Sequence, residues 1–280
     1  MRVANLAGRL ILLDGGLAVD VETASGGRFP ADPQQIYPRW AEFRHWAVQA
    51  SPGPGSPFSR EELGAPAPAP RQLIAIGLNY RDHISETGFA TPEHTPSVFT
   101  KFVTSVTGPM TEVRLPKDGH TDWEVELVVV VADRAFQIRE ADAWSHVAGL
   151  TVGQDISERV IQLENPSPQF SLAKSYPGFS PMGPCLVTPD EFEDPDDLRL
   201  GCTVNGDRVQ FGSTRQLIFS VPVLIAKLSA VMPLLPGDLI YTGTPAGVGL
   251  GRTPPRWLRR GDELISWVEG IGELRQRFVG

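Results

Sequence analysis

Two glutamates one residue apart open the longest apolar run of the chain, Asp122 to Ala132, which reads DWEVELVVVVA. Successive side chains of a strand point to opposite faces, so Glu124 and Glu126 are expected on the same side of a buried strand. Two like charges placed side by side at its mouth repel each other. A divalent cation such as Mg²⁺ would offset that repulsion, because it prefers carboxylate oxygens. The alternative is a solvated strand start, with both carboxylates in water.

The composition is that of an ordinary globular protein. The chain has 280 residues, of which 41% are hydrophobic and 21% charged. This length allows one large domain, or one domain with a smaller appendage. A net charge of −8 and a pI of about 5.2 argue against a nucleic-acid partner. No apolar run approaches the length of a membrane-spanning helix, so no membrane partner is expected.

The cellular location expected from the sequence is cytoplasmic. The first residues lack the apolar core of a secretory signal. Cys185 and Cys202 do not have metal-type spacing, and in such a chain they are expected to be reduced thiols. A disulfide between them is left open.

Two stretches rich in proline and glycine, 51–57 and 64–70, are typical of linkers. They predict a small N-terminal domain over residues 1–70 and a second domain over 71–280. In the first, residues 9–13 before Asp14-Gly15-Gly16 predict a hairpin, and 38–48 predict a short helix. Residues 1–70 carry no recognisable chemistry.

The second region contains many short strands and few helices. Asn205-Gly206 between strand-like arms predicts a hairpin. Residues 220–232 predict a helix whose Pro222 lies in the first turn, where the missing N–H is harmless. The fold class expected is therefore mostly β (α+β), with several helices attached. Further strands are predicted at 73–78, 124–132, 147–152, 239–242, 264–268 and 274–279.

His83 and Glu86 are the first candidates for catalysis. If the stretch after Tyr80 is helical, they lie three apart on one face. A carboxylate beside an imidazole raises its basicity and fixes its orientation, which makes a general base for water. The alternative is a surface ion pair.

Three further residues carry charge at predicted bends. Asp155 ends a strand-like run and could complete an oxygen-rich metal site, or it could cap the next turn. Arg159 could hold a substrate carboxylate, or pair with a surface acid. Lys174 could neutralise an oxyanion beside a metal, or be a solvated surface lysine. The glycine-rich turn over 236–249 could cradle a carboxylate or phosphate.

Taken together and in this order, five segments resemble the fumarylacetoacetate hydrolase family, in its branch of acylpyruvate hydrolases and 2-hydroxyhepta-2,4-diene-1,7-dioate isomerases. The resemblance covers roughly residues 70 to 280. The segments are 77–80 with His83 and Glu86, 122–127, 149–155, 174–184 and 236–249.

The resemblance implies a mixed β-sandwich roll with a small N-terminal α/β domain, and homodimers are common in the family. It implies one Mg²⁺ or Mn²⁺ per subunit on Glu124, Glu126 and Asp155. His83 and Glu86 match the water-activating dyad, and Lys174 matches the active-site lysine. The residues expected to bind substrate are Tyr80, Gln154, Arg159 and Thr244, of which Thr244 matches the family residue near the substrate carboxylate.

Two departures from the family pattern lie near the expected pocket. Many members have Asn before the metal-binding Asp, where this chain has Gln154. Many have Asp or Thr after the Lys-Ser-Phe stretch, where this chain has residues 176–178, Tyr-Pro-Gly. These changes spare the residues that match the metal ligands, and they leave the identity of the substrate open.

The activity expected is metal-dependent hydrolysis of a C–C bond in a 2,4-dioxo acid, acylpyruvate or fumarylacetoacetate-like. The products would be pyruvate or a related keto acid and a carboxylic acid. The same site could instead serve an isomerase or decarboxylase of 2-oxo or 2-hydroxy-diene dioates, including oxaloacetate. A metal-stabilised binding or scaffold protein is the non-enzymatic alternative.

Overall fold

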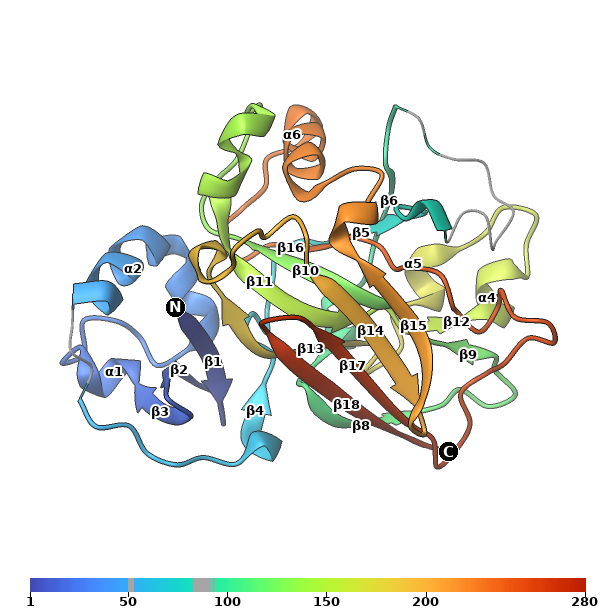
Figure 1. Cartoon of the computed structure of the whole chain (residues 1–280), viewed down its shortest axis with the longest axis horizontal. Coiled ribbons are helices and arrows are strands. Elements are labelled where there is room, and N and C mark those ends of the chain that lie inside the picture. The colour runs from blue at the N-terminus through green and yellow to red at the C-terminus, as the bar shows by residue number, and fades with distance from the viewer. Residues whose placement is uncertain (50–52, 83–91, 93) are drawn as a thin grey trace.

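The computed structural model describes residues 1–49, 53–82, 92 and 94–280, so His83 and Glu86 lie outside the described residues. The fold is built on an eleven-stranded mixed sheet (Figure 1). Its nine-strand path runs β3 (Leu17–Asp20), β2 (Arg9–Asp14), β1 (Arg2–Leu6), β13 (Ser180–Val187), β11 (Val147–Gln154), β10 (Val125–Val131), β16 (Leu239–Tyr241), β5 (Leu73–Gly77) and β6 (Ser97–Thr100). The other two strands are β4 (Leu63–Gly64), which pairs with β1, and β7 (Val106–Thr107), which pairs with β13.

A five-stranded sheet packs against the central strands of the large one. Its order is β15 (Asp207–Ser213), β14 (Arg199–Val204), β17 (Glu263–Val268), β18 (Gly272–Val279) and β8 (Met110–Arg114). A two-stranded ribbon joins β9 (Thr121–Asp122) and β12 (Ser157–Glu158). The described α-helices are α1 (Val21–Ala24), α2 (Trp40–Gln49), α4 (Arg159–Leu163), α5 (Phe170–Ala173) and α6 (Val221–Val231). Short 3₁₀ turns cover Pro33–Arg39, Arg60–Glu62, Val103–Ser105, Glu140–His146, Pro189–Glu191 and Thr214–Gln216.

The mostly β, α+β expectation is confirmed, and so are the expected elements within the described residues. The Asn205-Gly206 turn joins β14 to β15 with both residues at positive φ, as a type I′ hairpin turn requires. Helix α6 begins after Ser220 with Pro222 in its first turn. No described helix combines the length and the apolar character needed to cross a bilayer.

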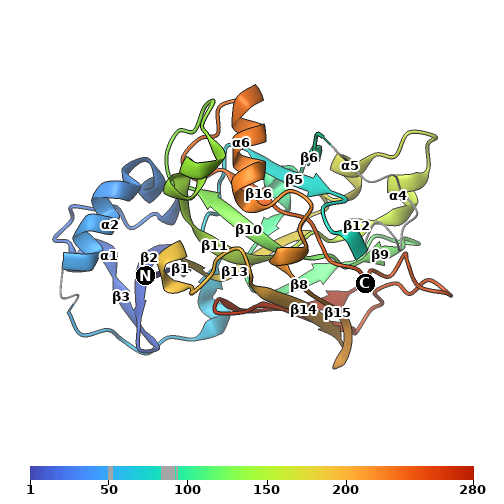
Figure 2. The same cartoon turned by 45° about the horizontal axis from the view of Figure 1, so that its top comes forward.

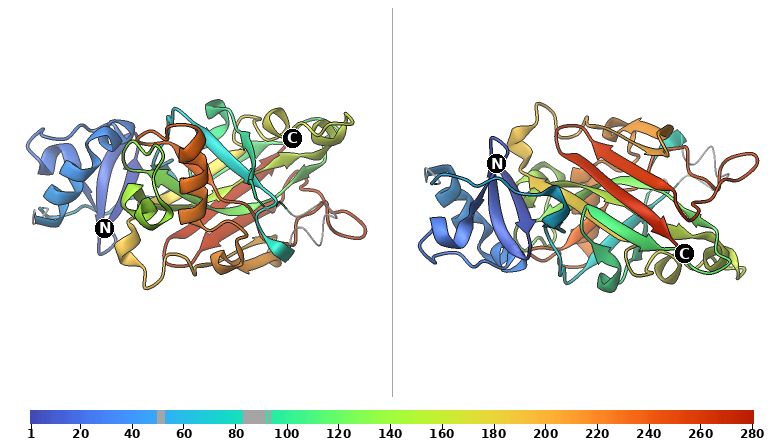
Figure 3. Two further views of the ribbon diagram at one scale, coloured as in Figure 1. Left: turned by 90° about the horizontal axis from the view of Figure 1, so that it is seen from above. Right: turned by 90° about the horizontal axis from the view of Figure 1, so that it is seen from below.

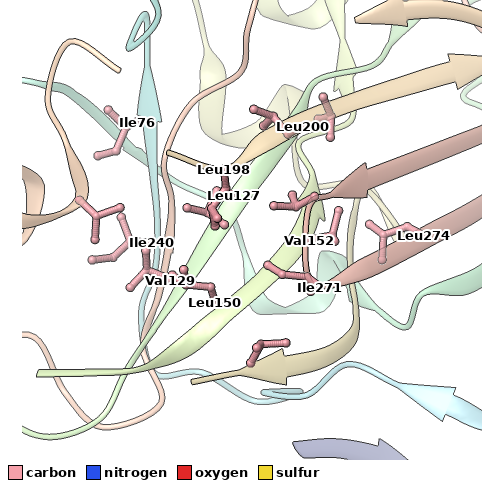
Figure 4. Close-up of a cluster of buried hydrophobic side chains, with 14 of the residues drawn as sticks. Ile76, Leu127, Val129, Leu150, Val152, Leu198, Leu200, Ile240, Ile271 and Leu274 are labelled. Carbon is pink, nitrogen blue, oxygen red and sulfur yellow. The ribbon is translucent and has the colours of Figure 1, made fainter. Parts of the chain in front are cut away.

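Strand β10 is buried on both of its faces, which explains its unbroken valine run. Leu127 and Val129 face the core between the two sheets, together with side chains from both sheets (Figure 4). Val128 and Val130 point the opposite way, into a second core. Because Glu126 is an even-numbered residue of the same strand, alternation directs it to the side of Val128.

The N-terminal region is a lobe that shares the large sheet. Strand β1 pairs with β13 through Arg2↔Val187 and Val3↔Leu186. The stretch 64–70 does not behave as a free linker: Ala67 is fully buried, and the Tyr37 hydroxyl donates to the Pro66 carbonyl at 3.0 Å. Its prolines remove N–H donors, so the segment packs without needing ladder partners. The division into separate domains at residue 70 stays a prediction.

The molecule is elongated along the large sheet. The N-terminal lobe lies at one end, and the segment that carries α4 and α5 lies at the other (Figure 3). Tilting the molecule shows α6 above β16 and β5 (Figure 2). The functional residues described below therefore lie far from the N-terminal lobe.

Gly153 allows the closest packing within the sheet. It lies opposite Glu126, and a Cβ atom there would come within 2.4 Å of Val128 Cγ2 and 2.8 Å of Tyr241 Cε1. We expect Gly153→Ala to lower the free energy of unfolding by about 1–3 kcal/mol, because an overpacked core must shift. Urea denaturation measures this. Gly53→Ala is the control, because open space surrounds Gly53; equal stability of the two variants would contradict the packing argument.

Candidate active site and metal centre

Three carboxylates meet where β10 and β11 pair. Glu124 immediately precedes β10, Glu126 lies within it, and Asp155 follows β11, with the Asp155 N–H donating to the Glu124 carbonyl at 2.9 Å. One ligand oxygen from each lies within 4.8 Å of the other two. Their exposed fractions are 6%, 1% and 1%, so the alternative of a solvated strand start is wrong.

Lys174 ends α5 inside this cluster, with 2% of its surface exposed. Its Nζ donates to Glu124 Oε2 and Asp155 Oδ2, both at 2.7 Å, and to Ser157 Oγ at 2.8 Å. Burial acts to lower the pKa of Lys174, but Asp155 and Glu124 outweigh it and the net shift is upward. Lys174 is therefore a charged, buried group, and the solvated alternative is wrong.

Arg159, the first residue of α4, is buried among charged and polar partners. Its Nη2 donates to Glu124 Oε1 at 2.6 Å and its Nε to Asp122 Oδ2 at 2.9 Å. Its Nη1 donates to Gln162 Oε1 at 2.7 Å. The partners are buried acids rather than a surface acid, and all three guanidinium nitrogens are used. Arg159 thus braces Glu124 and also lines the cavity described below, so its role in substrate binding stays a prediction.

Asp122 belongs to the same cluster, although sequence reasoning assigned it no role. Besides Arg159, it accepts from the N–H groups of Gly249 at 2.6 Å and Leu250 at 3.0 Å. It thereby fixes the glycine-rich loop after β16 against the start of β10. The alternation Asp122, Glu124, Glu126 was the available signal, because all three fall on every second residue.

Lys101 is the second functional candidate that sequence reasoning missed. It follows β6, its side chain is fully buried, and its Nζ contacts Asp155 Oδ1 at 2.5 Å and the Phe179 carbonyl at 3.0 Å. Burial lowers the pKa of Lys101, and Asp155 opposes that shift. Only the three-dimensional fold brings it to Asp155, so its local sequence offered no signal.

Glu126 is the carboxylate without a basic partner. Among the described residues no basic side chain forms an ion pair with it, and its Oε2 accepts from the Gly243 N–H at 2.8 Å. Gly243 has φ +101°, and a Cβ there would meet Asn79 Cβ at 2.8 Å, so glycine is required. Burial, then Asp155 and Glu124, raise the pKa of Glu126 well above its usual range.

The basic side chains of the cluster are too few to balance its carboxylates. Four carboxylates (Asp122, Glu124, Glu126 and Asp155) face three basic side chains (Lys101, Arg159 and Lys174), which leaves one negative charge when all are ionised. The uncompensated charge falls on Glu126, beside Glu124 and Asp155. An all-oxygen set of this kind suits a hard divalent ion, Mg²⁺ or Mn²⁺, so the residues fit the expected group.

A cavity opens above the carboxylates. Its polar lining consists of Glu124, Glu126, Arg159, Gln162, Lys174 and Thr244. Its other lining residues are Ile76, Gly77, Leu78, Phe99, Leu163, Phe170 and Leu250. The Gln162 oxygen is held by Arg159, so the amide nitrogen of Gln162 is the end that remains for a ligand.

Some of the expected substrate-binding residues line the cavity and others do not. Thr244 lines the cavity, but its hydroxyl donates to the Val125 carbonyl at 2.8 Å and so does not donate to a ligand. Gln154 and Tyr80 are not among the described lining residues. Gln154 accepts from Glu124 N–H and donates to Ser266 Oγ at 2.8 Å, because its side chain faces the second sheet. Tyr80 is 1% exposed.

The start of the segment that carries His83 and Glu86 is anchored at this site. Asn79 donates to the carbonyls of Phe219 at 3.0 Å and Thr242 at 2.8 Å, and it accepts from the Phe219 N–H. Thr242 immediately precedes Gly243, whose N–H binds Glu126. Asn79 itself is therefore tied to the chain next to Gly243. The roles of His83 and Glu86 stay predictions.

The sequence profile of the Fumarylacetoacetate (FAA) hydrolase C-terminal family matches residues 72–279. The chain belongs to the fumarylacetoacetate hydrolase family. The resemblance inferred from the five ordered motifs is thereby confirmed, and the match begins where the sequence change near residue 70 was placed.

Two relatives are similar in sequence to this chain over most of its length. The human mitochondrial oxaloacetate tautomerase FAHD2A is 41% identical over 227 residues, which are 81% of this chain and 72% of the relative. The 2,4-didehydro-3-deoxy-L-rhamnonate hydrolase of Sphingomonas sp. (strain SKA58) is 44% identical over 216 residues, 76% of this chain and 75% of the relative. The relatives of this chain thus include both a protein named as a tautomerase and one named as a hydrolase.

Two solved structures extend the likeness to the whole chain. A Mycobacterium smegmatis protein, whose assignment as HpcE is itself provisional, is 55% identical with a TM-score of 0.95, covering 100% of this chain and 99% of that one. Maleylpyruvate hydrolase from Sphingobium sp. SYK-6, in complex with manganese(II) and pyruvate, is 28% identical with a TM-score of 0.82, covering 100% and 99%. The fold, including the N-terminal lobe, is therefore shared.

We expect Glu126→Gln to weaken Mn²⁺ binding at least tenfold, because it removes the charge that no basic side chain compensates. Electron paramagnetic resonance of free Mn²⁺ measures the binding. The metal-free variant should be no less stable than the parent, because the raised pKa of Glu126 already favours its neutral form and the oxygen of the glutamine amide can still accept from the Gly243 N–H. Glu112→Gln, an exposed substitution on β8, is the matched control; equal Mn²⁺ affinity of both variants would contradict the assignment.

Proposed function

We propose that this enzyme is a divalent-metal-dependent hydrolase that cleaves the C3–C4 bond of a 2,4-dioxo acid. The observation that carries the proposal is the buried floor of Glu124, Glu126 and Asp155 with Lys174 anchored on two of them. A floor with an uncompensated negative charge suits a divalent cation and, through it, an anionic ligand. The relative named as a 2,4-didehydro-3-deoxy-L-rhamnonate hydrolase supports this reaction class.

We assign the metal site to Glu124, Glu126 and Asp155, with Mg²⁺ or Mn²⁺ as the ion. The maleylpyruvate hydrolase structure with manganese(II) and pyruvate supports both the ion type and a 2-oxo acid ligand. Such an ion supplies Lewis-acid stabilisation of negative charge on the 2-oxo acid. Arg159 holds Glu124, and Lys101 holds Asp155, so that both carboxylates keep their orientation.

The remaining residues are proposed to transfer protons and to stabilise the developing negative charge. His83, oriented by Glu86, is proposed to take a proton from water as the water attacks carbon 4. Lys174, kept charged by its two carboxylates, places a positive charge where an oxyanion develops, and the Gln162 amide can donate to the same oxygen. The C3–C4 bond then breaks, and carbon 3 takes up a proton, so the products are pyruvate and a carboxylic acid.

Acetylpyruvate tests the reaction directly. EDTA-stripped enzyme should not consume it, and added Mg²⁺ or Mn²⁺ should restore the loss of its absorbance. His83→Ala should lower kcat by about 10²–10⁴-fold, because the general base is gone, while Mn²⁺ binding stays unchanged. His45→Ala, on the exposed face of α2, is the control. Metal-independent turnover, or full activity without His83, would rule the mechanism out.

Oxaloacetate tautomerisation is the second candidate. The human relative named as an oxaloacetate tautomerase favours it, because moving a proton between keto and enol forms needs no attacking water. Spectrophotometry of enol-oxaloacetate separates the alternatives: metal-dependent loss of enol without pyruvate indicates a tautomerase, and pyruvate formation indicates a decarboxylase. If acetylpyruvate is not cleaved and the enol is consumed without pyruvate formation, tautomerisation replaces hydrolysis as the assigned function.

A scaffold role is disfavoured by family membership and by the buried lysines at the floor. Homodimer assembly and a cytoplasmic location remain predictions. Light scattering that gives twice the chain mass of 30.5 kDa would confirm the first, and cell fractionation tests the second.

A further inference from the structure

We propose that the cavity selects 2,4-dioxo acids whose acyl end is uncharged and apolar, and discriminates against dioates of the same length. This inference rests on the proposed function and adds the substrate class to it. It comes from how polarity is distributed over the cavity lining.

The cavity has a charged floor and an apolar wall. Charges are confined to the acidic residues and to the two basic side chains that pair with them. Phe99 and Phe170 form the centre of the wall, with ring centroids 5.4 Å apart. The side chains of the apolar wall are those of Ile76, Leu78, Phe99, Leu163, Phe170 and Leu250.

No basic side chain of the described wall is left for a second carboxylate. Arg159 and Lys174 are the basic residues that line the described cavity, and each is already bonded to two carboxylates. A charged group held at the wall would therefore have no fixed counter-ion among the described lining residues.

The two ends of a dioxo acid differ in what they need. Its 1-carboxylate and 2-oxo oxygen are the groups that the floor with a divalent cation would hold. The chain beyond carbon 4 then meets the wall. An alkyl end gains by leaving water there, whereas a terminal carboxylate would lose part of its hydration without a positively charged partner.

Binding of two acids that the proposed reaction cannot cleave tests the selectivity separately from turnover. 2-Oxoheptanoate and 2-oxoheptanedioate have the same seven carbons and differ only in a methyl or a carboxylate at carbon 7. Calorimetry with Mn²⁺-loaded enzyme should show about 100-fold tighter binding of 2-oxoheptanoate. Affinities within threefold of each other, or tighter binding of the dioate, would overturn the inference.

Helix α4 offers a matched pair of variants. Leu163 lines the cavity and Val160 does not, and both are 44% exposed, so a lysine at either position can reach water. Leu163→Lys should reduce the preference for 2-oxoheptanoate at least tenfold by supplying the missing cation, whereas Val160→Lys should leave it unchanged. Equal effects of the two variants would show that the wall does not set the preference.

Turnover of butanoylpyruvate and succinylpyruvate, which also differ only at carbon 7, separates the two proposals. Cleavage of butanoylpyruvate at a kcat/KM at least 100-fold higher supports both. Equal cleavage of both compounds leaves the hydrolase standing and overturns the selectivity. If neither compound is cleaved but 2-oxoheptanoate still binds more tightly than 2-oxoheptanedioate, the proposed hydrolysis is overturned and the preference for an apolar end is retained. If neither 2-oxo acid binds, the selectivity proposal is overturned as well.

Discussion

The structure depends on a buried ion cluster at the ends of β10 and β11. Charges taken out of water are costly unless each finds a partner with good geometry. Lys101, Arg159 and Lys174 come from three different segments, and each reaches one or two of the four carboxylates. The cluster therefore ties the end of β6, the start of α4 and the end of α5 to the central strands, and it positions the cavity lining at the same time.

Basic side chains of the described residues pair with every carboxylate of the cluster except Glu126. The proposed metal site depends on that unpaired charge. Glu126 has a backbone N–H for a partner but, among the described side chains, no basic one. A protein that needed only stability would gain from pairing or removing this charge. Its retention beside Glu124 and Asp155 is understandable if a divalent cation completes the cluster. The apolar wall above then governs which end of a substrate faces away from that ion.

Local sequence patterns predicted the parts of the site that lie along one strand. Alternation placed Glu124 and Glu126 on one side, and the Asn-Gly turn and the Pro222 helix start were equally local signals. The contacts that depend on chain folding were not predictable. Lys101 and Asp155 are 54 residues apart, and nothing around Lys101 indicates its burial.

The contacts that the sequence did not reveal have the same physical origin. Arg159 was expected to hold a substrate carboxylate or to pair with a surface acid, and the sequence does not show that Asp122 and Glu124 are its partners. Residues 64–70 looked like a linker because their composition conceals the contacts that bury Ala67. Gln154 lies next to Asp155 in the chain, but alternation turns its side chain toward the second sheet. In each case the three-dimensional neighbours, not the residue type, decide the role.

The most direct test of the central claim is anomalous diffraction from crystals of the EDTA-stripped protein soaked in Mn²⁺. The account predicts one strong anomalous peak per chain, within about 2.2 Å of an oxygen from each of Glu124, Glu126 and Asp155. A Mn²⁺-soaked crystal with no peak there, in which Glu126 keeps only its Gly243 contact, would contradict it.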